Sequence, residues 1–403
     1  MSTIEELSQQ TQLAEAAYAN FIDSTGNLIT TDAGITGALI ASGFSTNASG
    51  QSSQAVDFIA HWEVVDQFTA SGLFGLTDSS GFSATLFRNK DTRQYSIALR
   101  GTQLVPSDLS ADIGDILLDG ISLDQVTDMY NYWQSLNHVG NYQAVQLNTL
   151  TPETVALRTA YSLNAAAGLA YESTLRARQD VIIDYPSLTV RTVQFVDSSQ
   201  LADPRLQNGS GILSGTTFVN LDGHSLGGHL AMAFSRLFPN ATNSVVAVNG
   251  AGFNFGNTNV DHLFAMLSGA PGFDAGKITN LVGSAAMNLV SQDWLFLQQP
   301  AGRNEIYTES ASPSTTFGHG SSQMTDSLAL YNLFAIIDPS LDSTDGLATL
   351  TGIFENTSNR GRDSLELALD ALRKIFGKQS LTPGYAGVTD STTIKRGQVL
   401  NLE

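Results

Sequence analysis

One short segment constrains the fold of this chain more than any other. Residues Gly223 to Gly228 read GHSLGG; they follow the apolar stretch 216–222 and precede the amphipathic stretch 226–238, which ends at Pro239. A Gly-X-Ser-X-Gly run between a strand and a helix is typical of a sharp turn that projects the serine from the end of a buried strand. The segment predicts Ser225 as a nucleophile; the alternative is a glycine-rich turn that only links two elements.

The remaining patterns predict a sheet covered by helices. Alternating residues at 82–89 and 95–100 predict a β-hairpin, and the apolar runs 244–249 and 278–283 predict buried strands. Periodic apolar positions predict helices over 3–22, 56–70, 152–178, 324–337 and 363–376. The order strand, turn, helix, strand predicts an α/β fold of the α/β-hydrolase class with a mainly parallel sheet.

The length bears on domain organisation. The 403 residues exceed the roughly 250–300 residues that one simple core usually reaches. We predict a single α/β-hydrolase domain over 1–403, enlarged by an insertion and lid region at about 104–215 and followed by a loose tail from about 378.

A catalytic serine needs a base, and the chain has six histidines. In α/β-hydrolases the order along the chain is serine, acid, histidine, which disfavours the histidines before Ser225. His224 and His229 are too close to the nucleophile in sequence and are expected to pack elsewhere. His319 stands in a glycine-flanked loop before a helix and is the predicted base, whereas His262 falls inside a predicted helix.

The acid should lie between the serine and the base, after a strand. Asp293 follows the predicted strand 278–283 and is our choice, with Asp274 as its main competitor. Asp261 and the glutamates 305 and 309 are further alternatives, and each of these carboxylates could equally be a solvated surface group.

Two backbone N–H groups are expected to bind the oxyanion of the tetrahedral intermediate. The Leu226 N–H is the first, because it begins the helix after the serine. The Thr102 N–H is the second, because Arg100-Gly101-Thr102 leaves an earlier predicted strand; the alternative is an ordinary glycine turn.

Charge and cysteine content exclude several classes of function. The formal net charge is −19, which argues against nucleic acid as a partner, because phosphate binding needs basic patches. The absence of cysteine excludes disulfides, thiol catalysis and cysteine-ligated zinc. No basic segment followed by an apolar one opens the sequence, and no apolar run of transmembrane length occurs.

The motifs carry a resemblance. Leu99-Arg100-Gly101-Thr102, the GHSLGG turn, an aspartate and a loop histidine resemble class-3 lipases, the group of the fungal lipases. The runs at 112–116 and 325–332 are most similar to bacterial lipases and phospholipases secreted by type I systems. The resemblance implies an acyl-ester hydrolase with a mobile, calcium-binding lid after the Arg-Gly-Thr turn. The chain departs from the family in its long 140–215 segment and in the long stretch from Ser225 to Asp293.

The resemblance directs attention to the acidic stretch 109–137. Asp112, Asp115 and Asp119 could bind calcium, since their spacing places them on one helical face; a solvated acidic face is the alternative. The apolar residues of this stretch could form the inner face of a lid that opens on lipid, and the alternative is a helix pair packed in the core. They are Ile116, Leu117, Met129, Tyr130 and Trp133.

The sequence as a whole predicts a serine carboxyl-ester hydrolase, a triacylglycerol lipase that acts on lipid or other esters at an interface. The alternatives are a phospholipase A1 and, from another class, a noncatalytic binding module with a hydrolase fold. No organic cofactor is required, and calcium is possible. We expect export without an N-terminal signal peptide; a cytoplasmic location is the alternative. The terminal Leu402-Glu403 leaves open whether the natural chain continues.

Overall fold

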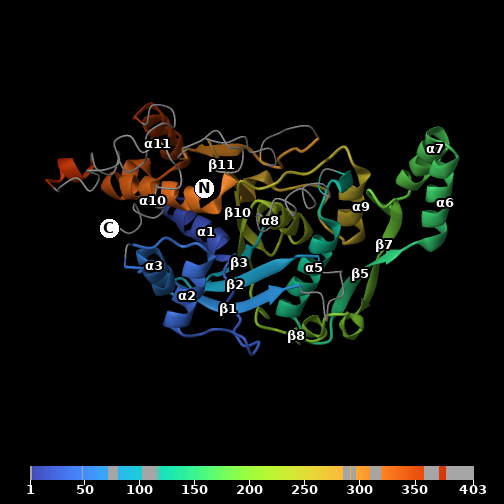
Figure 1. Ribbon diagram of the computed structural model, residues 1–403, viewed down its shortest axis with the longest axis horizontal. Coiled ribbons are helices and arrows are strands. Elements are labelled where there is room, and N and C mark those ends of the chain that lie inside the picture. Colours follow the sequence, from blue (N-terminus) through green and yellow to red (C-terminus); the bar gives the residue numbers. More distant parts are fainter. Residues whose placement is uncertain are drawn as a thin grey trace.

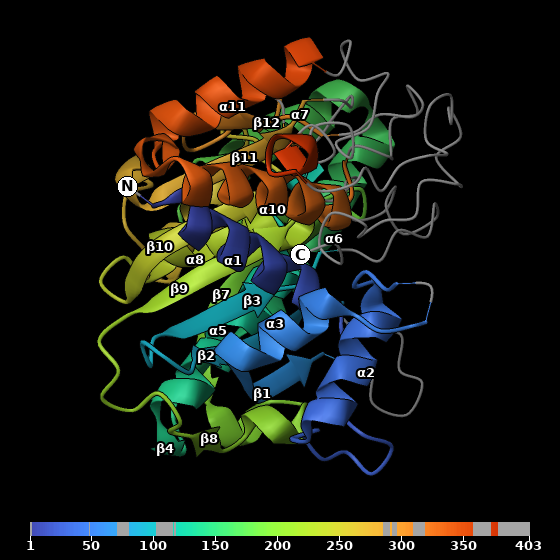
Figure 2. The same cartoon turned by 90° about the vertical axis from the view of Figure 1, so that its left-hand side faces the viewer.

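A seven-stranded sheet forms the centre of the protein, in the strand order β1-β2-β3-β9-β10-β11-β12. The structure is a computed structural model that describes residues 2–47, 49–70, 80–101, 116, 118–284, 291, 296–308, 319–357 and 372–377. Strands β3, β9, β10, β11 and β12 run parallel, and β1 and β2 extend the sheet antiparallel at one edge. Figure 2 shows the strands stacked in this order from β1 to the last strands. The strands are β1 Trp62–Thr69, β2 Ser83–Asn89, β3 Tyr95–Leu99, β9 Val219–His224, β10 Thr242–Val248, β11 Ile278–Gly283 and β12 Arg303–Ile306.

Helices cover both faces of this sheet. One face packs against α5, α8 and α9, and the other against α1, α2, α3 and α10, with α11 beyond α10 (Figures 1 and 2). The arrangement is an α/β-hydrolase fold, as the sequence predicts. The helices are α1 Ile4–Ala16, α2 Asp32–Ser42, α3 Ser53–His61, α5 Leu123–Asn137, α8 Leu226–Leu237, α9 Thr258–Met266, α10 Ser321–Ile337 and α11 Thr344–Thr357.

The stretch between β3 and β9 adds a second, smaller sheet. Strands β5, β7 and β6 form it in that order, and β4 pairs with β8. Helices α6 and α7 stand at its far end and project from the body of the molecule (Figure 1). These elements are β4 Val139–Gly140, β5 Gln143–Thr149, α6 Thr151–Leu163, α7 Ala165–Arg176, β6 Ile182–Asp184, β7 Thr189–Asp197 and β8 Gly209–Ser210.

Successive side chains of β9 point to opposite faces of the sheet, apolar ones to one face and buried polar ones to the other. Val219 and Leu221 point into the largest apolar cluster, which includes α5 and α8. Asp222 and His224, the intervening residues, are buried on the side of α1. Every residue of α8 is buried, because this helix fills the space between the sheet and α5. The strand thus ends with its polar side chains enclosed by protein.

Two predicted helices differ from the observed elements. The prediction over 56–70 is wrong in its second half: α3 ends at His61, and the alternating residues from Trp62 pair as β1 with β2. The prediction of one helix over 152–178 is also wrong. Asn164 interrupts it with an extended backbone, and its side chain accepts a hydrogen bond from the Ala167 N–H to cap α7. Most of the predicted helix 363–376 and the tail from 378 lie outside the described residues.

Asp222 is an uncommon residue for the middle of a sheet. It aligns with Ala98 on β3 and Val246 on β10, and neither carboxylate oxygen has a hydrogen-bond partner among the residues that the structure describes. Burial therefore raises the pKa of this carboxyl well above its ordinary value. Folding therefore favours the protonated form of Asp222.

This buried acid makes stability depend on pH. As pH rises from the ordinary carboxyl value of about 4 through the raised pKa, the unfolded chain loses a proton that the folded protein retains, so the free energy of unfolding falls. Asp222→Asn keeps the shape and removes the ionisation. We expect the melting temperature of the variant to exceed that of the wild type by a few degrees at pH 8 and to differ little at pH 4. Asp91→Asn, at an exposed carboxylate, is the matched control. A difference in melting temperature that does not change with pH would contradict the assignment.

Candidate active site

Ser225 occupies the turn between β9 and α8 in a conformation that serine rarely adopts. Its backbone has φ 57° and ψ −122°, which costs of order 1–3 kcal/mol for a residue with a Cβ. Hydrogen bonds hold the turn on three sides. The Ser225 N–H donates to the Val248 carbonyl at 2.9 Å, and the Ser225 carbonyl accepts from Gly228 at 3.0 Å and from Ala251 at 3.1 Å. The strand–turn–helix context predicted from GHSLGG is therefore present.

The glycines of the motif are required by close contacts between backbones. A Cβ on Gly223 would lie 2.2 Å from the Gly227 carbonyl oxygen, and a Cβ on Gly227 would lie 2.0 Å from the Leu99 carbonyl oxygen. Neither backbone atom can move aside as the end of a flexible side chain could. Glycine at both positions lets α8 start directly over the end of β3.

His319 lies beside the serine hydroxyl. The distance between His319 Nε2 and Ser225 Oγ is 2.8 Å, and both residues are buried. Burial, reinforced by the neighbouring His224, lowers the pKa of His319 to about 3, so the ring is neutral at pH 7 and Nε2 can accept the serine proton. His319 stands immediately before Gly320, which precedes the first turn of α10. The structure brings together the two residues that sequence reasoning selected as nucleophile and base.

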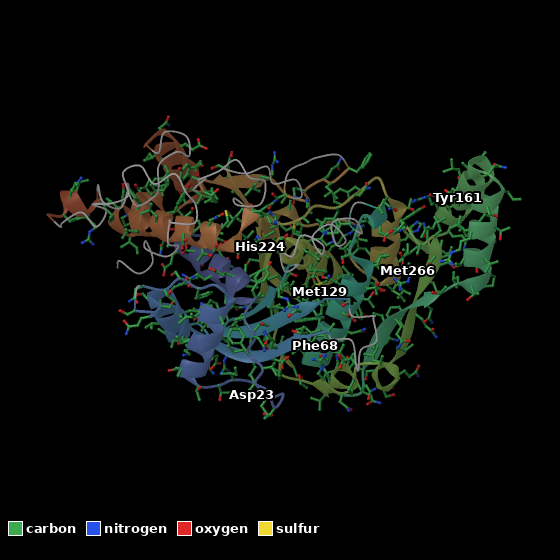
Figure 3. The ribbon with its side chains drawn as sticks, in the orientation of Figure 1. Asp23, Phe68, Met129, Tyr161, His224 and Met266 are labelled. Carbon is green, nitrogen blue, oxygen red and sulfur yellow. The ribbon has the colours of Figure 1, made fainter. Side chains whose placement is uncertain are left out.

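His224 fixes the main chain of His319 and does not face the serine hydroxyl. Its Nε2 lies 2.5 Å from the His319 carbonyl oxygen, and its Nδ1 lies 2.8 Å from the Tyr18 hydroxyl. Because a carbonyl can only accept, Nε2 carries the ring proton and Tyr18 donates to Nδ1. Burial lowers the pKa of His224 to about 4, so the ring is neutral at pH 7. His224 lies in the middle of the molecule in Figure 3.

Tyr18 and Asn249 belong to the site and were not found from the sequence. Asn249, just after β10, donates from Nδ2 to the His319 carbonyl at 3.1 Å, and its Oδ1 accepts from the Gly283 N–H at 2.9 Å. It thereby ties the loop of the base to the end of β11. No sequence motif marks either residue; the one signal for Asn249 is its position at the carboxyl end of a predicted strand.

One of the two predicted oxyanion donors, Leu226, lies directly beside Ser225. Leu226 is the first residue of α8, so its N–H has no acceptor within the helix. Thr102 lies outside the described residues, but Gly101 precedes it and is packed at the nucleophile. A Cβ on Gly101 would lie 3.2 Å from Ser225 Cβ and 2.4 Å from the His224 carbonyl oxygen. The Arg-Gly turn therefore passes directly beside the serine.

Asp293 lies outside the described residues, whereas three of the alternative acids lie within them. Asp274 accepts a hydrogen bond from the Gly276 N–H just before β11 begins. It therefore lies at the amino ends of the parallel strands, whereas Ser225 lies at their carboxyl ends. Asp261 pairs with Arg236 at 2.7 Å, and Glu305 lies within β12. The carboxyl end of β11, at Gly283, is the strand end that Asn249 links to His319. Asp293 follows that end in the chain, whereas Asp274 precedes the strand.

The other histidines have partners away from the nucleophile. His229 stacks on Phe253 with ring centroids 4.1 Å apart, and its Nδ1 contacts the Gly252 carbonyl. His262, on α9, contacts the Val181 carbonyl. These contacts agree with the packing roles expected for both residues.

The lid prediction is wrong for the residues of α5. Met129, Tyr130 and Trp133 are buried in the main core, where Trp133 packs edge-on against Phe234 of α8 and Met129 lies inside the molecule (Figure 3). The alternative, a helix packed in the core, is the one observed for this segment, because α5 closes one face of the sheet. Ile116 is also buried, in a cluster with Leu226, and most of 102–117 lies outside the described residues.

Two of the three proposed calcium ligands, Asp112 and Asp115, lie outside the described residues. Asp119 is buried and accepts a hydrogen bond from the Tyr185 N–H at 2.8 Å. Across the part of the chain that the structure describes, no group of three or more acidic or histidine side chains is arranged to hold a metal ion. Within the same part, no helix has the length and hydropathy needed to cross a bilayer.

Comparison with known proteins gives similarity to solved structures only. No protein-family model matches the chain, and no curated protein matches it. The structure is similar to the Lip2 lipase of Yarrowia lipolytica at 14% identity, over 77% of this chain and 81% of that chain, with a TM-score of 0.33. It is similar to a lipase of Rhizopus microsporus var. chinensis at 14% identity, over 70% and 67%, with a TM-score of 0.26. A triacylglycerol lipase of Penicillium expansum matches at 13% identity, over 77% and 81%, with a TM-score of 0.26.

Proposed function

We propose that this chain is a serine carboxyl-ester hydrolase that cleaves lipid esters, of the triacylglycerol lipase type. The observation that carries the proposal is the 2.8 Å contact between Ser225 Oγ and His319 Nε2, with the serine held at positive φ on a strand-to-helix turn. A turn that only links two elements needs neither the strained backbone nor an imidazole directed at its hydroxyl. This geometry supports covalent catalysis at Ser225.

The proposed reaction has two halves. Ser225 Oγ attacks the ester carbonyl carbon while its proton passes to His319 Nε2. The tetrahedral intermediate collapses, the bond to the alcohol oxygen breaks, and the alcohol leaves with the proton from His319. Water then attacks the acyl-enzyme by the same route, which releases the carboxylic acid and restores Ser225. All groups required for these proton transfers are side chains of this protein.

Charge stabilisation is assigned to three further residues. The N–H groups of Leu226 and Thr102 bind the oxyanion. Asp293 accepts a hydrogen bond from His319 Nδ1 and stabilises the imidazolium, which opposes the effect of burial on that ring. Calcium at Asp112 and Asp115 is retained as a proposal from the sequence, and no step of the reaction depends on it.

Apolar side chains beyond the serine support a lipid substrate. Ala251 contacts the Ser225 carbonyl through its N–H, and the chain then forms an antiparallel bridge between Phe253 and Gln298. Two residues further from this bridge in each segment are Phe255, 38% exposed, and Phe296, 65% exposed. Both residues lie in turns adjoining the bridge, and the Phe255 ring stacks against the ring of the buried Phe253. Exposed aromatic side chains in this position favour an acyl substrate presented at an interface.

A fluorophosphonate probe tests the enzyme assignment. The probe phosphonylates only a serine whose hydroxyl is activated. We therefore expect stoichiometric labelling of the wild type and no labelling of Ser225→Ala. For His319→Ala we expect the rate of labelling to fall by about 10⁴-fold, because the base is lost. Circular dichroism and melting temperature establish that both variants are folded. A folded wild type that is not labelled would identify the chain as a noncatalytic module.

Paired substitutions test the acid. Asp293→Asn should lower kcat by roughly 10³–10⁴-fold, because the amide cannot stabilise the imidazolium. Asp274→Asn is the matched control. It should leave kcat unchanged, since Asp274 lies at the amino ends of the parallel strands, away from Ser225 at the carboxyl ends. The assignment of Asp293 is refuted if the control loses activity and Asp293→Asn retains it.

A rate panel tests the substrate. We expect hydrolysis of emulsified triacylglycerol to exceed that of phospholipid vesicles. Phe255→Ser/Phe296→Ser should lower the rate on emulsion by about tenfold or more, as buried aromatic area is lost at the interface. The rate on a soluble short-chain p-nitrophenyl ester should change little. Faster hydrolysis of phospholipid would indicate a phospholipase A1, and equal losses on both ester types would contradict the interfacial role.

A further inference from the structure

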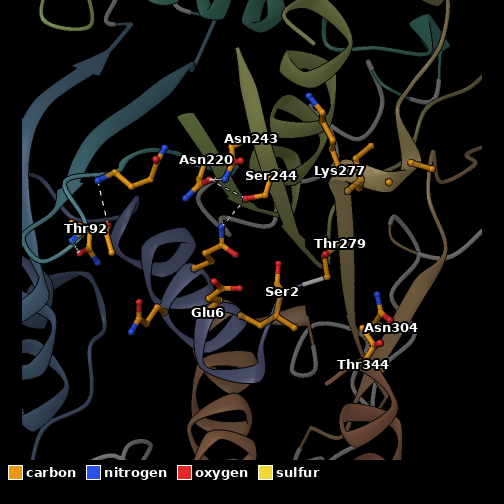
Figure 4. A pocket seen from close by; sticks show the side chains of 18 of the residues that line it. Ser2, Glu6, Thr92, Asn220, Asn243, Ser244, Lys277, Thr279, Asn304 and Thr344 are labelled. Carbon is orange, nitrogen blue, oxygen red and sulfur yellow. Dashed lines mark hydrogen bonds between the residues drawn. The ribbon is translucent and has the colours of Figure 1, made fainter. Parts of the chain in front are cut away.

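A cavity lies at the amino ends of the parallel strands, whereas Ser225 lies at their carboxyl ends. It is formed by the first residues of β9, β10 and β11 together with α1, and has a volume of about 700 Å³. Figure 4 shows Asn220, Ser244 and Thr279 from these strands facing Glu6 of α1 across it. Asn220 precedes Ser225 by five residues, so roughly 16 Å of extended strand separates the cavity from the nucleophile. The volume is in the range of about 300–1,000 Å³ of small-molecule sites.

The cavity carries no net charge among the residues that line it. Its cation, Lys277, donates from Nζ to the carbonyls of Pro239 at 2.7 Å and Thr242 at 2.8 Å. Its anion, Glu6, accepts from the Thr3 N–H at 3.0 Å as part of the cap of α1. Both charges are therefore engaged by backbone groups and offset each other. This balance disfavours a phosphate, a carboxylate or a metal ion as the ligand.

Carboxamides and hydroxyls make up most of the remaining lining. Asn220 Oδ1 accepts from Asn243 Nδ2 at 2.7 Å and from Ser244 Oγ at 3.0 Å, and Gln10 Nε2 donates to Ser244 Oγ at 3.2 Å. This chain, drawn as dashed lines in Figure 4, fixes the orientation of the three amides. Each amide keeps one group that takes no part in these hydrogen bonds. These groups are the donor Nδ2 of Asn220 and the acceptors Oδ1 of Asn243 and Oε1 of Gln10.

Donors and acceptors that alternate on a rigid array match a ligand with neighbouring hydroxyl groups, because each hydroxyl both donates and accepts. The apolar side chains of Leu7, Trp62 and Ile278 also line the cavity, but each is more than nine-tenths buried, so the surface offered to a ligand is mainly that of the amides and hydroxyls. An apolar acyl chain would leave these amide groups without hydrogen-bond partners. We propose that this cavity is a binding site for a neutral saccharide of one or two units, separate from the hydrolytic site.

Isothermal titration calorimetry with the full chain tests the proposal. The probes are glucose, maltose and N-acetylglucosamine, with glucose 6-phosphate and glucosamine as charged analogues. We expect saturable 1:1 binding of at least one neutral sugar, with weaker binding of its charged analogue. Ser225→Ala should bind the same sugar as the wild type does, because the cavity is remote from the nucleophile; this result is independent of whether the chain is an ester hydrolase.

Two variants and one control locate the binding. Asn243→Ala removes an exposed amide of the array, and Ala275→Trp places a large side chain at the rim. Each should weaken binding by about tenfold or more, as expected for one lost hydrogen bond or a blocked site. Asn208→Ala, at an exposed asparagine elsewhere on the surface, should leave the affinity unchanged. The proposal is overturned if no neutral sugar binds saturably, if the charged analogues bind as well, or if both cavity variants bind like the wild type.

Discussion

The site depends on how closely three backbone segments approach one another where α8 begins. The ends of β3 and β9 and the first turn of α8 are so near that any side chain at Gly223 or Gly227 would overlap a carbonyl group. This contact leaves Ser225 no room for an ordinary helical or extended conformation, and its backbone takes positive φ. The strain is offset by the burial of the whole of α8 against the sheet. The hydroxyl then projects at the carboxyl end of β9, with the first N–H groups of α8 beneath it.

The position of the proposed base, His319, is fixed through its own main-chain carbonyl oxygen. The main-chain oxygen of His319 accepts hydrogen bonds from His224 and from Asn249. His224 is held in turn by Tyr18, just beyond α1, and Asn249 is bonded to Gly283 at the end of β11. Segments that are far apart in the chain therefore fix the loop before α10. Loss of one partner would leave a buried polar group without a hydrogen bond. The desolvation penalty of such a group exceeds the net stabilisation that the hydrogen bond provides.

The two ends of the parallel sheet differ in chemistry. At the carboxyl end, glycines, a serine and buried neutral histidines lie together. At the amino end, amides and hydroxyls surround a cavity whose charges are engaged by backbone groups. Asp222 lies between them on β9 as a buried acid without hydrogen-bond partners among the described residues. Calcium binding at Asp112 and Asp115 and export without an N-terminal signal peptide stay predictions from the sequence.

The sequence by itself determined the elements whose signals are local. The GHSLGG turn, the hairpin of β2 and β3 and the strands around it follow from spacing over a few residues, and chain order with loop context selected His319 to accompany Ser225. Only the tertiary structure decided which faces are buried. Periodicity cannot tell a core helix from a lid, so α5 was misassigned although its apolar face was recognised. Tyr18 and Asn249 carry no motif, because their roles arise from contacts between segments distant in sequence. The same holds for the amide-lined cavity, whose residues come together only when α1 crosses the amino ends of the strands.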